Sequence, residues 1–319
     1  MFPARSIILF TTLSGAGFGA LAWLGLLALS GGLPEGVATA LLACGGAMAM
    51  AVAGLVASTF HLRHPERAWR AFSQWRTSWL SREGVCSVAT LIAALAMAVA
   101  WASDGPQTGT VAAAGAVTLV GALATVVSTA MIYRSLWAVP QWHNGWTLPV
   151  FLALAAATGG LLVCAVLAWT GALAASPAWL AIGTLTAVVG AIVAKACAWS
   201  AAERAPAASD TAGALGLTGR ATSVHPLEAP NTGQTWLQHE MAYRVARRHA
   251  RKLRRIAAGF GAGLALPALL LSLWLGGPAG TLLLTLAALA ALVAVLVERW
   301  LFFAEARHKV TLYYGEHQV

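Results

Sequence analysis

Residues 84–102 read GVCSVATLIAALAMAVAWA and contain no charged side chain. A helix needs about 20 consecutive, mainly apolar residues to cross the hydrocarbon core of a bilayer. Backbone groups in lipid must form hydrogen bonds within their own segment, so an apolar run of this length predicts a helix. The stretch therefore indicates a membrane-spanning helix.

The rest of the chain repeats this pattern. Of its 319 residues, 59% are hydrophobic and only 10% are charged, whereas soluble domains carry about 25% charged residues. The apolar runs are continuous, which argues against the short alternating strands of a membrane β-barrel. We predict an all-α fold, a single integral membrane domain that bundles eight transmembrane helices at residues 6–30, 36–60, 84–102, 109–133, 148–171, 177–200, 256–276 and 280–304. Small residues of the first span (Ser14, Gly15, Gly17, Gly19) are typical of a close helix-packing face.

Basic residues indicate the orientation of this bundle. All but one of the 20 lysines and arginines lie at the N-terminus, in the second, fourth or sixth connection, or at the C-terminal end. The exception, Lys195, falls in the sixth span near the same face. The opposite connections carry only Glu35 and Asp104. The positive-inside rule then places both termini in the cytoplasm. The net charge of +9 is an orientation signal, and we expect no nucleic-acid partner.

The sixth connection, residues 201–255, has two parts. Residues 201–235 are rich in Ala, Pro, Gly, Ser and Thr, which predicts a flexible cytoplasmic loop. The following WLQHEMAYRVARRHARKLRR predicts a basic helix. That helix either extends the seventh span, or binds anionic membrane lipids, or contacts a partner protein.

Cysteine and histidine positions limit the cofactors that this chain can hold. The four cysteines are isolated in different spans, so we expect no iron–sulfur cluster on this chain. None of the eight histidines lies at mid-depth in a span, which argues against a bis-histidine haem. The histidine positions leave room for a haem with one ligand near the basic face. We expect no metal site on this chain.

Ionisable and aromatic residues gather where the spans end on the basic side. They are His61, His64, Arg82, Glu83, Tyr133, Arg134, Trp142, His143, Trp146, Lys195, Glu298 and Arg299. Ionisable groups at membrane depth indicate function, and His and Glu are proton carriers. Such residues, if they converge, would form a pocket for a lipid-soluble quinone. The tryptophans also suit interfacial anchoring, and Glu83 also suits stabilisation of a helix N-terminus. Adjacent residues point about 100° apart on a helix, so Arg82 and Glu83 are not expected to face one another.

Three segments resemble a known family. Two of them, HLRHPERAWRAF at 61–72 and SWLSREG at 78–84, are similar to the signature of dimethyl sulfoxide reductase membrane-anchor subunits. The positions that match this signature are His61, Leu62, Pro65, Arg67, Ala68, Ser78, Leu80, Ser81 and Glu83. MIYRSLWAVPQWHNGWTLPVFL at 131–152 and ERWLFFAEARH at 298–308 are further matches.

The resemblance implies an anchor that binds an iron–sulfur subunit directly and, through it, a molybdopterin catalytic subunit. It implies exchange of electrons with ubiquinone or menaquinone in a bacterial inner membrane, without haem. His61 and Glu83 match the family's quinone-binding residues. We predict that the quinone site also includes His64, Arg67, Ser78, Arg82, Tyr133, Arg134, Trp142, Trp146 and Glu298.

The inward-facing basic loop resembles those members that serve cytoplasmic sulfite-oxidising enzymes. We therefore expect electrons to flow from sulfite to quinone. A quinol-oxidising anchor of a dimethyl sulfoxide or polysulfide reductase, a secondary transporter and a purely structural anchor are the alternatives.

Overall fold

The computed structural model describes residues 4–60, 62, 64–204, 209–217, 224, 227–228, 233 and 245–314. Elements in these ranges are helical, and eight helices among them are long and apolar enough to cross a membrane. They are α1 (Arg5–Leu29), α2 (Val37–Thr59), α3 (Trp79–Asp104), α4 (Gly109–Arg134), α5 (Thr147–Trp169), α6 (Ala178–Arg204), the succession α9 (Val245–Phe260), η3 (Gly261–Ala265) and α10 (Leu266–Leu275), and α11 (Gly277–Ala304). The predicted all-α class and the eight apolar helices are confirmed.

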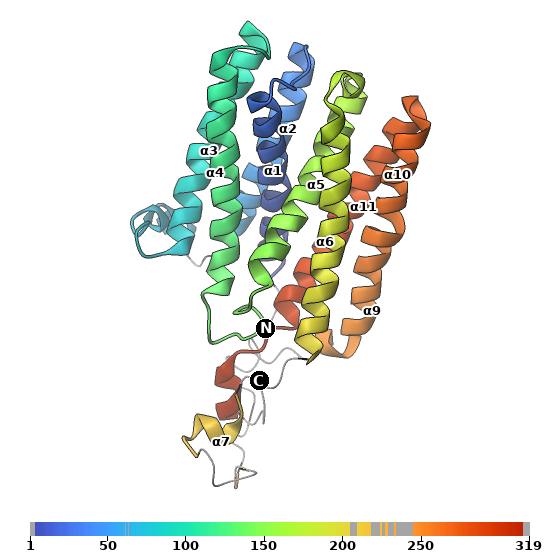
Figure 1. Ribbon diagram of the computed structural model, residues 1–319. Helices are drawn as coiled ribbons and strands as arrows, with labels where there is room; N and C mark the ends of the chain where they lie inside the picture. The colour runs from blue at the N-terminus through green and yellow to red at the C-terminus, as the bar shows by residue number, and fades with distance from the viewer. Residues whose placement is uncertain are drawn as a thin grey trace.

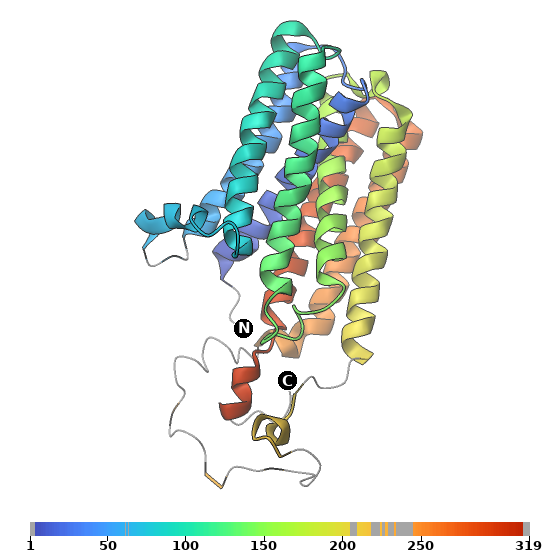
Figure 2. The ribbon, with the colours of Figure 1, turned by 60° about the vertical axis from the view of Figure 1, so that its left-hand side comes forward.

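The helices run side by side along one direction (Figures 1 and 2). α1 lies inside the bundle and packs against α2, α4, α5 and α11. The short elements η1 (Pro65–Phe72), η2 (Leu173–Ala175), α7 (Thr211–Ala214) and η4 (Lys309–Tyr314) lie in the connections and the C-terminal segment. Both figures show η1 projecting from the side of the bundle.

Glycines allow α1 and α5 to touch backbone to backbone. A Cβ atom on Gly19 would lie 2.0 Å from the Ala155 carbonyl oxygen, and one on Gly159 would lie 2.2 Å from the Gly19 carbonyl carbon. Gly17 similarly meets the backbone of α2. The predicted packing face of the first span is thus confirmed at Gly17 and Gly19, whereas Gly15 faces open space.

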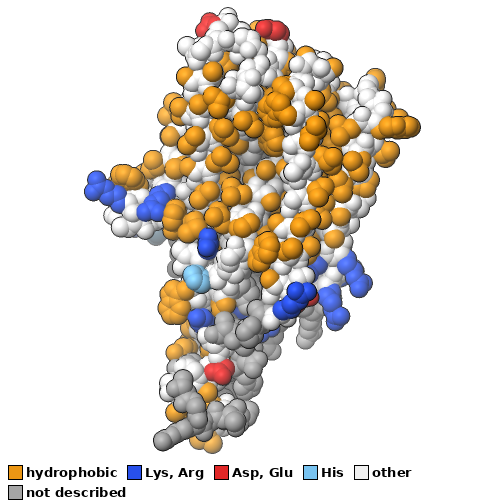
Figure 3. Space-filling view, in the orientation of Figure 1, with side chains coloured by type: hydrophobic (Ala, Val, Ile, Leu, Met, Phe, Trp, Pro, Cys, Tyr) orange, Lys and Arg blue, Asp and Glu red, His pale blue; other side chains and the backbone are white. Residues whose placement is uncertain are grey.

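The two ends of the bundle differ in their basic residues. Glu35 and Asp104 lie in or beside the connections of one end, and the space-filling view shows acidic side chains there and Lys and Arg side chains toward the other end (Figure 3). The two ends therefore differ as the charge pattern predicts.

Two helices begin differently from the sequence prediction. α3 begins at Trp79 rather than at residue 84, because Ser78 caps its N-terminus by accepting a hydrogen bond from the Ser81 backbone N–H at 3.5 Å.

α9 begins at Val245 and continues into η3 and α10. The described part of the basic segment is therefore an extension of the seventh membrane helix, as one of the three interpretations proposed.

Candidate functional site

Glu83 is a buried carboxyl group at the start of α3. Its residue is 4% exposed, and it accepts a hydrogen bond from the Thr129 hydroxyl of α4. The Thr129 hydroxyl also lies 3.0 Å from the Thr125 carbonyl oxygen within α4. A carboxyl group among membrane helices costs free energy unless it is hydrogen-bonded, and such groups usually have a function. Glu83 is therefore the leading candidate for a functional residue on this side of the bundle.

Arg82 points away from Glu83, as their adjacency predicts. Its Nε donates to the Trp75 carbonyl at 3.0 Å, its Nη2 donates to the Arg76 carbonyl at 2.6 Å, and its guanidinium lies 4.2 Å from the Trp79 ring centroid. The Ser81 hydroxyl donates to the Ala71 carbonyl. These bonds hold the connection between α2 and α3 against the start of α3, so Arg82 positions this segment.

An aromatic cluster joins α4, α5, α11 and the connection that precedes α5. Its members are Tyr133, Trp142, Phe151, Phe302 and Phe303, with ring centroids between 5.3 and 5.8 Å apart. The Trp142 indole also donates to the Phe302 carbonyl at 2.9 Å. Both Tyr133 and Trp142 are buried. The cluster closes this end of the bundle beside the buried charges of α11.

Glu298 and Arg299 form a buried ion triad with Lys195. Lys195 Nζ of α6 lies 2.5 Å from Glu298 Oε1, and Arg299 Nε donates to Glu298 Oε2. The Arg299 guanidinium lies 3.9 Å from the Phe151 ring centroid. Within the described residues, Arg299 Nη2 has no hydrogen-bond partner. A buried guanidinium N–H without a partner is costly, so this atom is available to a ligand or a water molecule.

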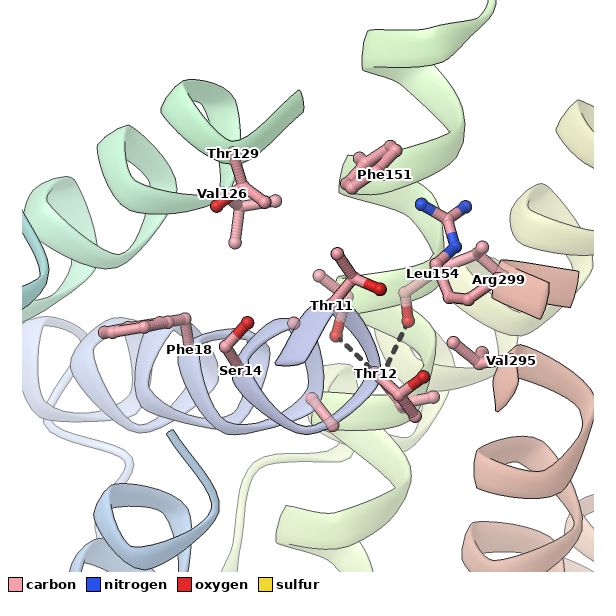
Figure 4. Close-up of a pocket in the computed structure, with 14 residues that line it drawn as sticks. Thr11, Thr12, Ser14, Phe18, Val126, Thr129, Phe151, Leu154, Val295 and Arg299 are labelled. Atoms are coloured by element: carbon pink, nitrogen blue, oxygen red, sulfur yellow. Dashed lines mark hydrogen bonds between the residues drawn. The ribbon is translucent and has the colours of Figure 1, made fainter. Parts of the chain in front are cut away.

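A cavity of about 20 Å³ lies beside Arg299. Figure 4 shows Arg299 and Phe151 on one side of it and Thr129 on the other, with Thr11 and Thr12 of α1 between them. A cavity needs roughly 10–15 Å³ to hold one water molecule. This space therefore suits a single water between the Glu83–Thr129 pair and the ion triad.

A larger cleft of about 140 Å³ lies on the other side of the triad. It is bounded by α5, α6, α9, η3 and α11, and Lys195, Trp199 and Glu298 line it among apolar residues. The Lys195 ammonium lies 5.1 Å from the Trp199 ring centroid. The cleft thus offers an apolar space with one buried ion pair on its wall.

Arg254 closes the bundle below this cleft. Its guanidinium lies 2.5 Å from a Glu203 oxygen of α6 and 3.1 Å from a Glu305 oxygen just after α11. Burial raises the pKa of Glu305 above its ordinary value, although Arg254 opposes that change. These pairs join α9 to the ends of α6 and α11.

The structure brings only some of the predicted quinone-site residues into the interior. The buried ones are Glu83, Tyr133, Trp142 and Glu298. Arg299 lies between Glu298 and the Glu83–Thr129 pair.

The remaining predicted residues lie elsewhere. Ser78 is a helix cap, Arg134 is half-buried at the end of α4, and Trp146 is 37% exposed at the start of α5. His64 and Arg67 are exposed beside Glu66 on the projecting segment. His61 lies outside the described residues.

The structure adds Thr129, Lys195 and Arg299 to this candidate site. Lys195 and Arg299 were expected among the ionisable residues that gather on the basic side but not among the predicted quinone-site residues, and Thr129 was not predicted at all. A lone lysine within an apolar run and a buried Glu–Arg pair near the end of a span were the signals for the latter two. Nothing in the sequence distinguished Thr129 from the other threonines of α4, because its role depends on which helix face meets Glu83.

Two comparisons with known proteins match this sequence over most of its length. A model of the DMSO reductase anchor subunit (DmsC) family matches residues 2–207. A sulfite dehydrogenase subunit of Allochromatium vinosum is 34% identical over 333 aligned residues, which cover 98% of this chain and 99% of that protein.

Proposed function

The chain belongs to the family of DMSO reductase anchor subunits, and from this membership we propose that it is the quinone-reactive membrane anchor of a sulfite-oxidising complex. An iron–sulfur subunit would bind its basic end directly, and a molybdopterin catalytic subunit would bind beyond it. Electrons from sulfite would then reach the quinone pool through this chain's quinone site. The end-to-end match to a protein named as a sulfite dehydrogenase subunit supports this assignment.

The charge distribution supports a cytoplasmic position for the partners. Lys and Arg side chains gather toward one end of the bundle (Figure 3), and the positive-inside rule places such an end in the cytoplasm of the bacterial inner membrane. Arg67, Arg70 and Arg76 are exposed on the projecting segment between α2 and α3. We propose that this segment contacts an acidic surface of the iron–sulfur subunit.

The overall reaction needs protons as well as electrons. Sulfite, water and quinone give sulfate and quinol, so two electrons and two protons move to the quinone oxygens. The chain's own contribution would be to bind the ring and to supply protons at its oxygens. The buried Glu83 carboxyl group, held by Thr129, is the observation that carries this proposal. Its burial keeps bulk water from it, and carboxyl groups are efficient proton carriers. We propose His61 as the second residue at the ring.

The test uses the complex purified in mild detergent with its bound subunits. Mass spectrometry identifies the subunits, and molybdenum, iron and sulfite-dependent reduction of decylubiquinone are measured on the same sample. Glu83→Gln is expected to lower quinone reduction by about 10²-fold or more, the range for loss of a positioned proton carrier, while sulfite oxidation with an artificial acceptor persists. Glu35→Gln is the matched control, because Glu35 is an exposed carboxyl group at the opposite end of the bundle. Equal activity in the two variants would refute the role of Glu83.

The reverse direction of electron flow is the second candidate. The family takes its name from a reductase, so a quinol-oxidising anchor fits the same membership. A complex with molybdenum and iron that oxidises quinol with a sulfoxide or polysulfide as acceptor, and that is inactive with sulfite, would establish this alternative.

A further inference from the structure

We propose that the cleft bounded by α5, α6, α9, η3 and α11 is a second binding site for a quinone ring, distinct from the site at Glu83. In this site Lys195 donates a hydrogen bond to a ring carbonyl oxygen, and Trp199 forms part of the wall. The identity of the ligand rests on the proposed function, because that function requires a lipid-soluble quinone.

The cleft has the size and lining for one ring. Its volume is about 140 Å³, and an apolar protein cavity of about 150 Å³ accommodates benzene. Most lining side chains are apolar, including Leu154, Val188 and Ile192. A six-membered ring therefore fits, with its substituents and tail directed out of the cleft.

The ion pair supplies the polar contact that a quinone needs. An ammonium group has three N–H donors, and Lys195 Nζ forms an ion pair with Glu298 Oε1 at 2.5 Å. A carbonyl oxygen of the ring would accept from another of these donors. Small-molecule binding sites combine apolar walls with a few polar groups that fix the orientation of the ligand. Here Arg299 donates a hydrogen bond to Glu298 and so holds the ion pair in place.

The mouth of the cleft opens between membrane helices. Ala196 of α6 and Ala258 of α9 both line the cleft and are exposed, so they mark its opening. Lys195 lies about 14 Å inside the end of α6 at Arg204, at about 1.5 Å of rise per residue. A phospholipid headgroup stays near the bilayer surface, whereas a quinone ring diffuses within the hydrocarbon region. Depth and lateral access thus favour a quinone as the occupant.

A local change of helix geometry shapes the same cleft. The five residues Gly261–Ala265 form a π-helix between α9 and α10, and Gly261, Ala262 and Ala265 line the cleft. π-Helical turns are rare and occur frequently at functional sites. This turn presents only small side chains to the space, which leaves room for the ring.

The cleft is separate from the site at Glu83. Arg299 and the 20 Å³ cavity lie between the Thr129 side of the bundle and the Lys195–Glu298 pair. Two rings bound at the two places would therefore contact different residues and label different helices.

Photolabelling of the intact complex in membranes tests this inference. The probe is an azido-benzoquinone with a decyl tail, and labelled peptides are mapped by mass spectrometry. We expect labelling of residues 191–199 and 257–265 in addition to peptides near Glu83. Ala258→Trp fills the mouth and should lower labelling of the cleft by about tenfold, equivalent to a tenfold weaker affinity. Val193→Trp is the matched control, because Val193 is exposed on α6 near the same depth but does not line the cleft.

The outcomes separate the two proposals. Labelling confined to α3 and α4, equal labelling in the Ala258→Trp and Val193→Trp variants, or a phospholipid that the probe does not displace from the cleft would each overturn the second site. A labelled cleft in a complex that transfers no electrons between sulfite and quinone would support the second site and refute the proposed function.

Discussion

The ion triad of Lys195, Glu298 and Arg299 predicts an unusual order of stability among its variants. Glu298 is the single anion between two cations, and all three side chains are largely removed from solvent, at 4%, 14% and 2% exposure for Glu298, Lys195 and Arg299. Glu298→Gln removes the anion that the two buried cations share. Breaking a buried ion pair by removal of one partner typically costs about 3–5 kcal/mol, and we expect this variant to lie in the upper part of that range.

Removal of Lys195 should be milder. Lys195→Met keeps the length of the side chain and leaves Glu298 paired with Arg299, so no uncompensated charge remains. The expected cost is about 1.5–3 kcal/mol, the range for one lost hydrogen bond to a charged group. The double variant Lys195→Met/Glu298→Gln leaves one cation, Arg299, over the Phe151 ring. It should therefore be more stable than Glu298→Gln alone.

The assay is reversible unfolding in mixed detergent micelles, with sodium dodecyl sulfate as denaturant and circular dichroism as readout. The four proteins form a double-mutant cycle, which isolates the interaction between positions 195 and 298. A Lys195→Met variant that loses as much free energy of unfolding as Glu298→Gln would refute the reasoning. A double variant less stable than Glu298→Gln would refute it as well.

Three further predictions concern packing and hydrogen bonds. Gly159→Ala should lower the free energy of unfolding by about 3 kcal/mol or more, because the added methyl group meets the α1 backbone. Gly15 faces open space, so Gly15→Ala should lower the free energy of unfolding by less than about 1 kcal/mol or should increase it. Equal effects of the two substitutions in SDS titrations would contradict the close contact between α1 and α5. Thr129→Val should lower the free energy of unfolding by about 1–3 kcal/mol, because it removes the hydrogen-bond donor to Glu83. Thr129→Ser keeps the hydroxyl group and should retain most of this stability. Equal quinone reduction and equal unfolding in the two variants would argue against this hydrogen bond. Trp142→Phe should cost about 1 kcal/mol through loss of the indole hydrogen bond to α11, and an unchanged unfolding midpoint would show that the aromatic packing alone suffices.

Hydropathy predicts the helices of this protein because each span must satisfy its own backbone in lipid. The same rule explains the error at α3: residues 79–83 include polar groups, so the apolar run begins later than the helix does. Ser78 as N-cap was a signal for the earlier start, since serine is favoured at that position.

The site was harder to predict because its contacts join distant helices. Glu83 stood out as a carboxyl group at the start of an apolar run, but its partner Thr129 depends on how α3 and α4 face each other. Similarly, the Lys195–Glu298 pair depends on the placement of α6 beside α11. His64 and Arg67 are close to Glu83 in the sequence, yet they lie on a segment that projects outward (Figures 1 and 2).

The central position of α1 has a consequence for the biogenesis of the protein. α1 leaves the ribosome before α5, yet the surface of α1 around Gly19 is covered only when α5 is present, and α5 begins at Thr147. At a synthesis rate of about 5–20 residues per second, roughly 7–30 s pass between the two helices. During that interval the groove around Gly19 must face lipid or the insertion machinery. α1 thus meets α2 early but waits for the helix that covers Gly19.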